Sequence, residues 1–114
     1  MSSKQRQGQL GEQRALTYLK AQGLTLVEAN FSCKLGEIDL ILRDGENLVF
    51  VEVRERADKS HGGAAASITP AKIGRIVRAA ELYLQRFARP PPCRIDVVAI
   101  DGDSLEWLRD AVQV

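Results

Sequence analysis

Three short β-rich stretches follow one another between two stretches of helical periodicity, and this order limits the fold more than any other feature of the sequence. The β-rich stretches run from Leu24 to Phe31, from Glu37 to Arg43 and from Leu48 to Arg54. Glycine-containing turn sequences at 34–36 and 44–47 separate them. The sequence therefore predicts a meander of three strands.

The helix predicted before this meander is amphipathic. In residues 7–22, Ala15, Leu16 and Leu19 recur at helical spacing, and Gly23 follows where a helix C-cap usually lies. We therefore expect a helix that ends at Gly23 and turns one apolar face inward.

The helix predicted after the meander has a clear start signal. Thr69 is a good N-cap residue, and Pro70 suits the first helical position. Apolar residues recur at helical spacing from Ile73 to Leu84. The helix is expected to end near Arg89, because three consecutive prolines follow.

The remaining segments complete a single domain over residues 1–114. Residues 57–67 contain two adjacent glycines and no periodicity, which predicts a mobile loop. Residues 94–100 are expected to form a nearly continuous apolar strand, and residues 105–112 a final strand. The predicted order is helix, three strands, helix, then one or two strands.

The composition is typical of one compact domain in a reducing compartment. Of 114 residues, 45% are hydrophobic and 27% are charged. A chain of this length can bury about two thirds of its unfolded surface, so it needs no disulfides or structural metal. Cys33 and Cys93 lie far apart, which excludes a zinc ribbon or a dense disulfide framework. With a polar N-terminus and no long apolar run, we expect a cytoplasmic protein without membrane segments.

Opposite charges are segregated along the chain, although the net charge is only +1. Between Arg54 and Arg94 there are nine basic and three acidic residues, which leaves an excess of acids elsewhere. A basic segment beside an acidic one is typical of a nucleic-acid enzyme that binds a divalent ion. Solvated protein faces produce such blocks as well.

Acidic residues lie inside two of the predicted strands. Because side chains alternate between the faces of a strand, Glu37 and Asp39 share one face of theirs. Glu52 and Arg54 share one face of the next strand. Taken alone, Glu52 and Arg54 also match an ion pair on an exposed sheet face.

The turn between these two strands decides which acids meet. A turn at 45–46 would place Asp39 opposite Glu52, and a turn at 44–45 would place Glu37 there. Either register opposes two carboxylates, which is unfavourable without a compensating cation. Carboxylates, a backbone carbonyl and water suit Mg²⁺ or Mn²⁺, and metal-assisted phosphodiester hydrolysis is the chemistry that such a site favours.

Two further acids fall on faces predicted to be buried. Glu12 lies three residues before Ala15 on the apolar side of the first helix, and Asp96 interrupts the apolar strand at 94–100. A buried carboxylate is costly unless a positive or hydrogen-bonding group meets it. For Asp96 we expect Arg94 or a backbone donor as that partner, and therefore a structural role.

Several motifs, in order along nearly the whole chain, resemble the YraN family of small bacterial proteins. They are Gly11-Glu12 with Ala15, Gly36-Glu37-Ile38-Asp39-Leu40-Ile41, Val51-Glu52-Val53-Arg54-Glu55-Arg56, Lys72 and Arg94-Ile95-Asp96-Val97-Val98-Ala99-Ile100. That family is assigned to the restriction-endonuclease-like PD-(D/E)XK superfamily and is similar to archaeal Holliday-junction resolvases. The resemblance implies an α/β fold with a restriction-endonuclease-like core, a mixed β-sheet flanked by helices in the order α-β-β-β-α-β-(β).

The resemblance also implies roles for individual residues. Asp39 matches the superfamily's motif aspartate, Glu52 its second acid, and Glu12 the helix-borne acid of resolvase-like members. Together with the backbone carbonyl of Val53 they would hold Mg²⁺ or Mn²⁺. Glu37 is either a further ligand or only a cap of the turn before it. The implied activity is that of a metal-dependent endonuclease on DNA, with branched or flap structures as candidate substrates.

Arg54 departs from the superfamily pattern, which usually has lysine at this position. Arginine stays protonated at any working pH, so Arg54 can stabilise phosphate charge but cannot act as a base. The sequence is therefore also compatible with a decayed nuclease fold that binds nucleic acid or a protein partner. A homodimer formed through an exposed strand is a third interpretation.

Basic residues of the second helix are candidates for DNA contacts. Lys72, near the helix start, could approach the scissile phosphate or take the role that Arg54 cannot. Arg75 and Arg78 could contact the DNA backbone. Solvated surface residues would give the same sequence pattern.

Overall fold

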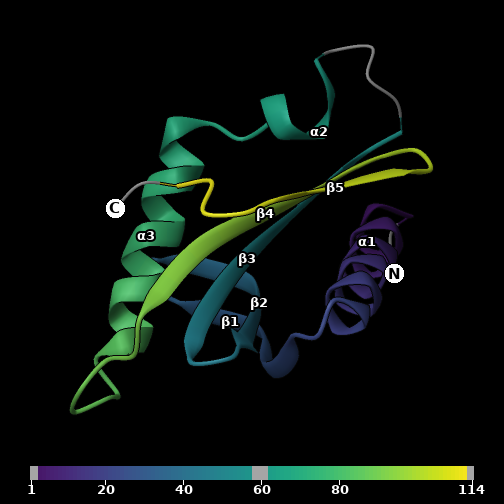
Figure 1. Cartoon of the computed structure of the whole chain (residues 1–114). Coiled ribbons are helices and arrows are strands. Elements are labelled where there is room, and N and C mark those ends of the chain that lie inside the picture. Colours follow the sequence, from purple (N-terminus) through teal and green to yellow (C-terminus); the bar gives the residue numbers. More distant parts are fainter. Residues whose placement is uncertain (1–2, 58–61, 113–114) are drawn as a thin grey trace.

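The structure, a computed structural model, describes residues 3–57 and 62–112, and it describes side chains from residue 10 onward. This part of the chain contains five strands and three helices. The elements are α1 (Ser3–Ala21), β1 (Thr25–Cys33), β2 (Gly36–Asp44), β3 (Asn47–Arg56), α2 (Gly63–Ala66), α3 (Pro70–Leu84), β4 (Cys93–Asp101) and β5 (Ser104–Leu108). The strands form one sheet in the order β1-β2-β3-β4-β5, with α1 and α3 on opposite sides of it (Figure 1).

The sheet combines antiparallel and parallel pairing. Strands β1, β2 and β3 form the predicted antiparallel meander. Strand β4 is parallel to β3, so the chain must cross over between them, and it does so through α3. Strand β5 returns antiparallel to β4. A mixed sheet between helices, in this order, fits a restriction-endonuclease-like core and confirms the predicted fold class.

Side-chain alternation along the strands gives each face of the sheet its own apolar core. Leu42 of β2 belongs to the buried cluster on the α1 face, together with Leu19. Phe50 of β3 belongs to the cluster on the α3 face, where its ring contacts Tyr83 edge-on at 5.7 Å between centroids. Burial on both faces fixes which side of the sheet every neighbouring polar residue must face.

The end of α1 is a Schellman motif around the predicted Gly23. The Leu24 amide donates to the Leu19 carbonyl at 3.1 Å, and the Gly23 amide donates to the Lys20 carbonyl at 3.0 Å. Gly23 has a φ of 98°, a conformation that L side chains rarely adopt. The predicted C-cap is therefore confirmed.

Helix α3 begins where the sequence predicts and ends earlier. The Thr69 hydroxyl accepts a hydrogen bond from the Lys72 amide at 3.2 Å, with Pro70 at the first helical position. After Leu84 the chain forms tighter turns, and Phe87 packs against the core instead of continuing the helix. None of the helices in the described ranges is both long and apolar enough to span a bilayer.

The segment predicted as a loop at 57–67 contains one helical turn, α2. Gly62 and Gly63 enter it with φ values of 89° and 85°, so the adjacent glycines permit the turn that precedes α2. The Ala64 amide donates to the Asp101 carboxylate at 2.7 Å and ties α2 to the end of β4. Residues 58–61 of the predicted loop lie outside the described residues.

The last strand is shorter than the predicted 105–112. After Leu108 the chain turns at Asp110, whose φ is 50°, and the Ala111 amide donates to the Ile95 carbonyl at 2.9 Å. Val112 then enters the apolar core on the α3 face. The chain leaves the sheet because the buried Asp96 carboxylate accepts the Asp110 amide at 2.8 Å.

Candidate functional site

The β2–β3 hairpin opens at the position of its acidic residues. The pair Asp44 and Asn47 flanks the turn, so the turn lies at 45–46, one of the two registers considered above. The described ladder ends at the pair Leu40 and Val51. Beyond it the Asp39 side chain takes the place of a backbone acceptor.

Asp39 and Glu52 therefore meet where the two strands separate. The Val53 amide donates to Asp39 Oδ2 at 2.8 Å. Glu52 alternates with Phe50, so it faces the α3 side of the sheet, and it lies close enough to Asp39 that, after burial, the charge of Asp39 raises its pKa. The predicted meeting of these two acids is present in the structure.

Glu12 reaches the same place from α1. It shares a groove of about 590 Å³ with Glu37, Asp39 and Glu52, among other residues. Helix α1 lies close to β3 because Gly11 precedes Glu12: a Cβ atom at this position would lie 3.1 Å from Glu55 Oε1. Acids from two layers of the fold thus line one groove, with Glu37 exposed at its edge.

Burial and mutual repulsion raise the pKa values of these acids. Burial, and then the charge of Asp39, raise the pKa of Glu52 to about 8, while Arg54 opposes the shift. The same two causes raise the pKa of Glu12 to about 7. Burial also raises the pKa of Asp39, against the lowering effect of the Val53 amide. The protein scaffold therefore does not neutralise the acidic group.

The donor set has the chemistry of a site for a hard divalent cation, although its side chains are not preassembled around one point. Glu12, Asp39 and Glu52 offer only carboxylate oxygens, which Mg²⁺ and Mn²⁺ prefer. As these side chains stand, no group of three or more His, Cys, Asp and Glu within 3–57 and 62–112 could hold a metal ion. Instead the raised pKa values of Glu12 and Glu52 favour bound protons near neutral pH. Holding an ion therefore requires loss of those protons and side-chain rotation.

Arg54 lies beside the acids, and the C-cap residue of α2 fixes its position. Its Nη1 lies 3.7 Å from Glu52 Oε1, and its Nε donates to Ser67 Oγ at 3.1 Å. The Ser67 hydroxyl in turn donates to the Ala64 carbonyl at 2.5 Å. The guanidinium is thus fixed at the boundary of the acidic groove by a chain of hydrogen bonds.

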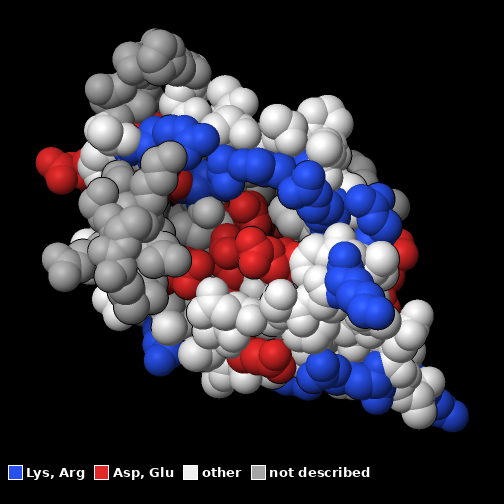
Figure 2. Space-filling model, turned by 180° about the vertical axis from the view of Figure 1, so that it is seen from behind, with Lys and Arg blue, Asp and Glu red and all other residues white. Residues whose placement is uncertain are grey.

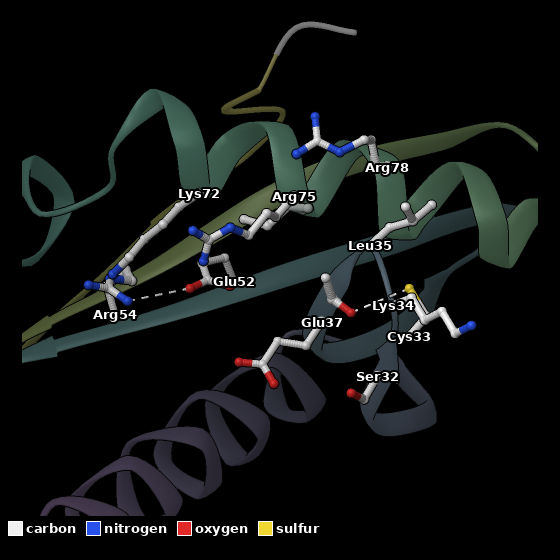
Figure 3. A pocket seen from close by; sticks show the side chains of 12 residues that line it. Ser32, Cys33, Lys34, Leu35, Glu37, Glu52, Arg54, Lys72, Arg75 and Arg78 are labelled. Atoms are coloured by element: carbon white, nitrogen blue, oxygen red, sulfur yellow. Dashed lines mark hydrogen bonds and ion pairs between the residues drawn. The ribbon is translucent and has the colours of Figure 1, made fainter.

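A row of cations borders the acids. Figure 2 shows acidic side chains gathered in a hollow, with a band of basic side chains along one side of it. A second cavity of about 600 Å³ shares Glu37, Glu52 and Arg54 with the acidic groove and is lined from α3 by basic side chains: Lys72, Arg75 and Arg78. In Figure 3 these three extend from α3, with Lys72 directed toward Arg54 and Arg78 nearer to Leu35 of the β1–β2 turn. We call this cavity the basic pocket.

The predicted site residues lie in two adjoining cavities: Glu12, Asp39 and Val53 line the acidic groove, Lys72, Arg75 and Arg78 line the basic pocket, and Glu37, Glu52 and Arg54 line both. Lys72 faces Glu52 and Arg54 closely enough for both to affect its pKa, which burial, as the largest cause, lowers. Val53 contributes its amide to Asp39, and the role predicted for its carbonyl stays a prediction.

Two residues of the site escaped the sequence analysis. Ser67 holds Arg54, but a lone serine after an alanine run carries no signal of that role. Asn30 of β1 lies close enough to Glu12 to oppose the rise in its pKa that burial causes, and Asn30 has a φ of 56°. Asparagine is enriched in this left-handed conformation, so an asparagine inside a predicted strand was a signal that could have been used.

Comparison with known proteins identifies one family. Residues 11–100 match the family described as "Uncharacterised protein family UPF0102". A UPF0102 protein of Herminiimonas arsenicoxydans is 59% identical over 106 residues, which cover 93% of this chain and 86% of the relative. One of Cupriavidus metallidurans is 60% identical over 111 residues, covering 96% and 83%. One of Nitrosomonas eutropha is 50% identical over 112 residues, covering 97% of each. The chain therefore belongs to the UPF0102 family, which is the YraN family that its motifs resemble.

Proposed function

We propose that this protein is a divalent-metal-dependent nuclease that hydrolyses phosphodiester bonds in DNA. The observation that carries the proposal is the acidic group at the opening of the β2–β3 hairpin, which Arg54 compensates only in part and which lies directly beside a basic pocket. A cation and a polyanion would together satisfy both charge excesses. The fold supports the proposal as well, since it fits a restriction-endonuclease-like core.

Each side chain of the site has a defined part in this proposal. Glu12, Asp39 and Glu52, with the carbonyl of Val53, would hold Mg²⁺ or Mn²⁺. When bound, such an ion polarises a phosphate and lowers the pKa of a coordinated water. In the reaction, a water oxygen would form a bond to phosphorus and give up one proton, one bridging P–O bond would break, and the departing oxygen would take up one proton, so that one water is consumed.

Arg54 stabilises charge in this scheme rather than moving a proton. Its guanidinium is held by Ser67 and lies beside Glu52, where it can donate to the oxygens of a phosphate. Lys72, Arg75 and Arg78 then hold neighbouring phosphates of the same strand. Glu37 is exposed and lines both cavities, so its carboxylate repels phosphates that approach the acidic groove.

Calorimetric titration of the protein with Mn²⁺ and Mg²⁺ tests the proposal. We expect saturable binding by the wild type, and at least about tenfold weaker binding by Asp39→Asn and Glu52→Gln. Glu46→Gln is a matched control, because Glu46 lies in the turn at the other end of the same hairpin. Absence of binding up to millimolar metal, or equal binding by Asp39→Asn, would remove the proposed mechanism.

Cleavage assays with added Mn²⁺ then test the reaction on four kinds of DNA: single-stranded, duplex, flap and four-way. We expect metal-dependent products from the wild type and from Glu46→Gln, and none from Asp39→Asn. Products that persist in EDTA would contradict the proposed chemistry.

A second candidate function is DNA binding without catalysis, which Arg54 at the usual lysine position favours. It predicts salt-sensitive DNA binding that survives EDTA, and no product from any substrate. The Arg54→Lys variant separates the two functions. If only this variant cleaves DNA, the natural protein is a binding module.

A further inference from the structure

The turn between β1 and β2 presents an apolar side chain inside a basic surface. Five large apolar side chains are exposed in the described part of the chain, and Leu35 at this turn is one of them, with 46% of its surface accessible. Leu35 alone among the five lines the basic pocket. An isolated exposed leucine needs no explanation, but its position among cations does.

The turn is held in place from both sides. The pair Cys33 and Gly36 closes the β1–β2 ladder and leaves only Lys34 and Leu35 at the tip. Gly36 lies so close to α3 that a Cβ atom there would come within 2.7 Å of the Arg75 carbonyl oxygen. Only glycine permits this approach, so the tip has a fixed position relative to the cations of α3.

The surroundings of Leu35 match one class of ligand. Figure 3 shows Leu35 and Lys34 at the turn, with Arg75 and Arg78 on the neighbouring helix and Glu52 deeper in the cavity. Cations around an apolar side chain suit a ligand that combines phosphate with an apolar face. A nucleotide joins both in one unit, whereas in an acidic peptide the charge and any apolar side chain belong to different residues.

We propose that the basic pocket is a subsite for one unpaired nucleotide, whose base packs on Leu35 and whose phosphate contacts Arg75 and Lys72. This inference rests on the proposed function, because it assigns a substrate feature to the same site. A volume of about 600 Å³ is enough for a ligand of this size. Within a continuous duplex both faces of a base are covered by its neighbours, so Leu35 can reach a base face only where stacking is interrupted.

DNA affinity in EDTA tests the inference without any dependence on catalysis. The probes are a fully paired duplex and the same duplex with one unpaired nucleotide, both labelled for fluorescence anisotropy. We expect the wild type to bind the second probe about tenfold more tightly, and Leu35→Ala to lose this preference while keeping its affinity for the paired duplex. Leu35→Phe should keep the preference, because an aromatic ring also stacks on a base.

A matched control and a second readout make the result specific. Leu82→Ala removes another exposed leucine, which lies on α3 outside the basic pocket, and should bind both probes like the wild type. With 2-aminopurine as the unpaired base, wild type should change its fluorescence on binding, and Leu35→Ala should not.

The outcomes separate this inference from the proposed function. Equal affinity of the wild type for both probes, or an unchanged preference in Leu35→Ala, overturns the nucleotide subsite even if metal-dependent cleavage is found. Failure of the wild type to bind either probe in EDTA also overturns the subsite, whereas the nuclease is tested separately by the metal-dependent cleavage assays. Loss of cleavage with the preference intact overturns only the nuclease.

Discussion

Two aspartates in the same sheet have opposite environments. Asp96 of β4 is fully buried, and its two carboxylate oxygens accept hydrogen bonds from the Arg94 Nε, the Trp107 indole and the Asp110 amide. Asp39 of β2 accepts one backbone amide and otherwise has carboxyl groups as its neighbours.

The difference distinguishes an acid that holds the fold together from an acid that the fold merely tolerates. Every donor around Asp96 stabilises its charge, so this charge joins β4, β5 and the segment after Leu108. Around Asp39, burial and then the charge of Glu37 raise the pKa, and they outweigh the lowering effects of the Val53 amide and of Glu52, so no stability is gained from its charge. Acids whose surroundings oppose their ionisation, as those of Asp39 do, are typical of functional sites.

The largest effect that tests this comparison is expected from Asp96→Ala. The substitution leaves the Trp107 indole and the Asp110 amide without their acceptor and disrupts the ion pair with Arg94. We expect the free energy of unfolding in denaturant to fall by about 3–5 kcal/mol. Asp39→Asn is the counterpart and should unfold at or above the wild-type denaturant concentration. If both variants lose stability equally, the distinction between the two aspartates is wrong.

A smaller effect is expected from Glu52→Gln, and it depends on pH. The pKa of Glu52 is about 8 in the folded protein against a usual 4.5, so between these values the folded state holds a proton that the unfolded state has released. Wild-type stability should therefore fall as the pH rises from about 5 to 8, and level off above that.

The amide side chain of the Glu52→Gln variant has no proton to lose, so this decline should shrink in the variant. In EDTA we expect Glu52→Gln to be more stable than wild type by about 2 kcal/mol at pH 8.5 and equal to it at pH 5. Neighbouring acids share the titration, which keeps the difference below the full shift of one isolated group. A variant that is less stable at both pH values would contradict the electrostatic account of the site.

Local signals in the sequence were enough to predict most of the fold. Strand alternation placed Asp39 and Glu52 on one face, and Gly23 and Thr69 marked helix ends that the structure contains. The hairpin register stayed open because Gly45 belongs to both candidate turns. Leu40 and Leu42 share a face with Val49 and Val51 in both registers, because the registers differ by two residues, so side-chain alternation could not choose between them.

Contacts between distant segments lay beyond the sequence. Helix α2 has four residues, too few for a periodic pattern, and only its contact with Asp101 shows why it forms. The anchoring of Arg54 by Ser67 depends on that helix. Likewise, the early end of β5 follows from the acceptor that Asp96 offers to the Asp110 amide.

Trp107→Phe tests one of the hydrogen bonds that the buried Asp96 accepts. The phenyl ring preserves most of the apolar packing but cannot donate to Asp96, from which the indole nitrogen lies at 2.9 Å. The other donors to Asp96 remain, so we expect a loss of about 1.5 kcal/mol in the free energy of unfolding, less than for Asp96→Ala. Denaturant titration followed by circular dichroism measures it. A loss as large as that of Asp96→Ala would mean that the indole bond carries the whole network.

Asp44→Asn should have the smallest effect, because it changes the network of Asp96 at its solvent-facing end. Asp44 pairs with Arg94 at 2.9 Å, but its side chain is 36% exposed, whereas that of Asp96 is 0% exposed. Water can replace this partner, so we expect the free energy of unfolding to fall by about 0.5 kcal/mol, and by less in high salt. Unfolding titrations with and without about 0.5 M salt measure how much of this loss is electrostatic. This concentration is roughly five times the one at which charges are already screened over about 10 Å. A loss near that of Asp96→Ala would mean that the exposed pair of Asp44 and Arg94 stabilises the fold as much as the buried carboxylate does. The contrast between Asp96 and Asp39 would then result from Arg94 and not from burial.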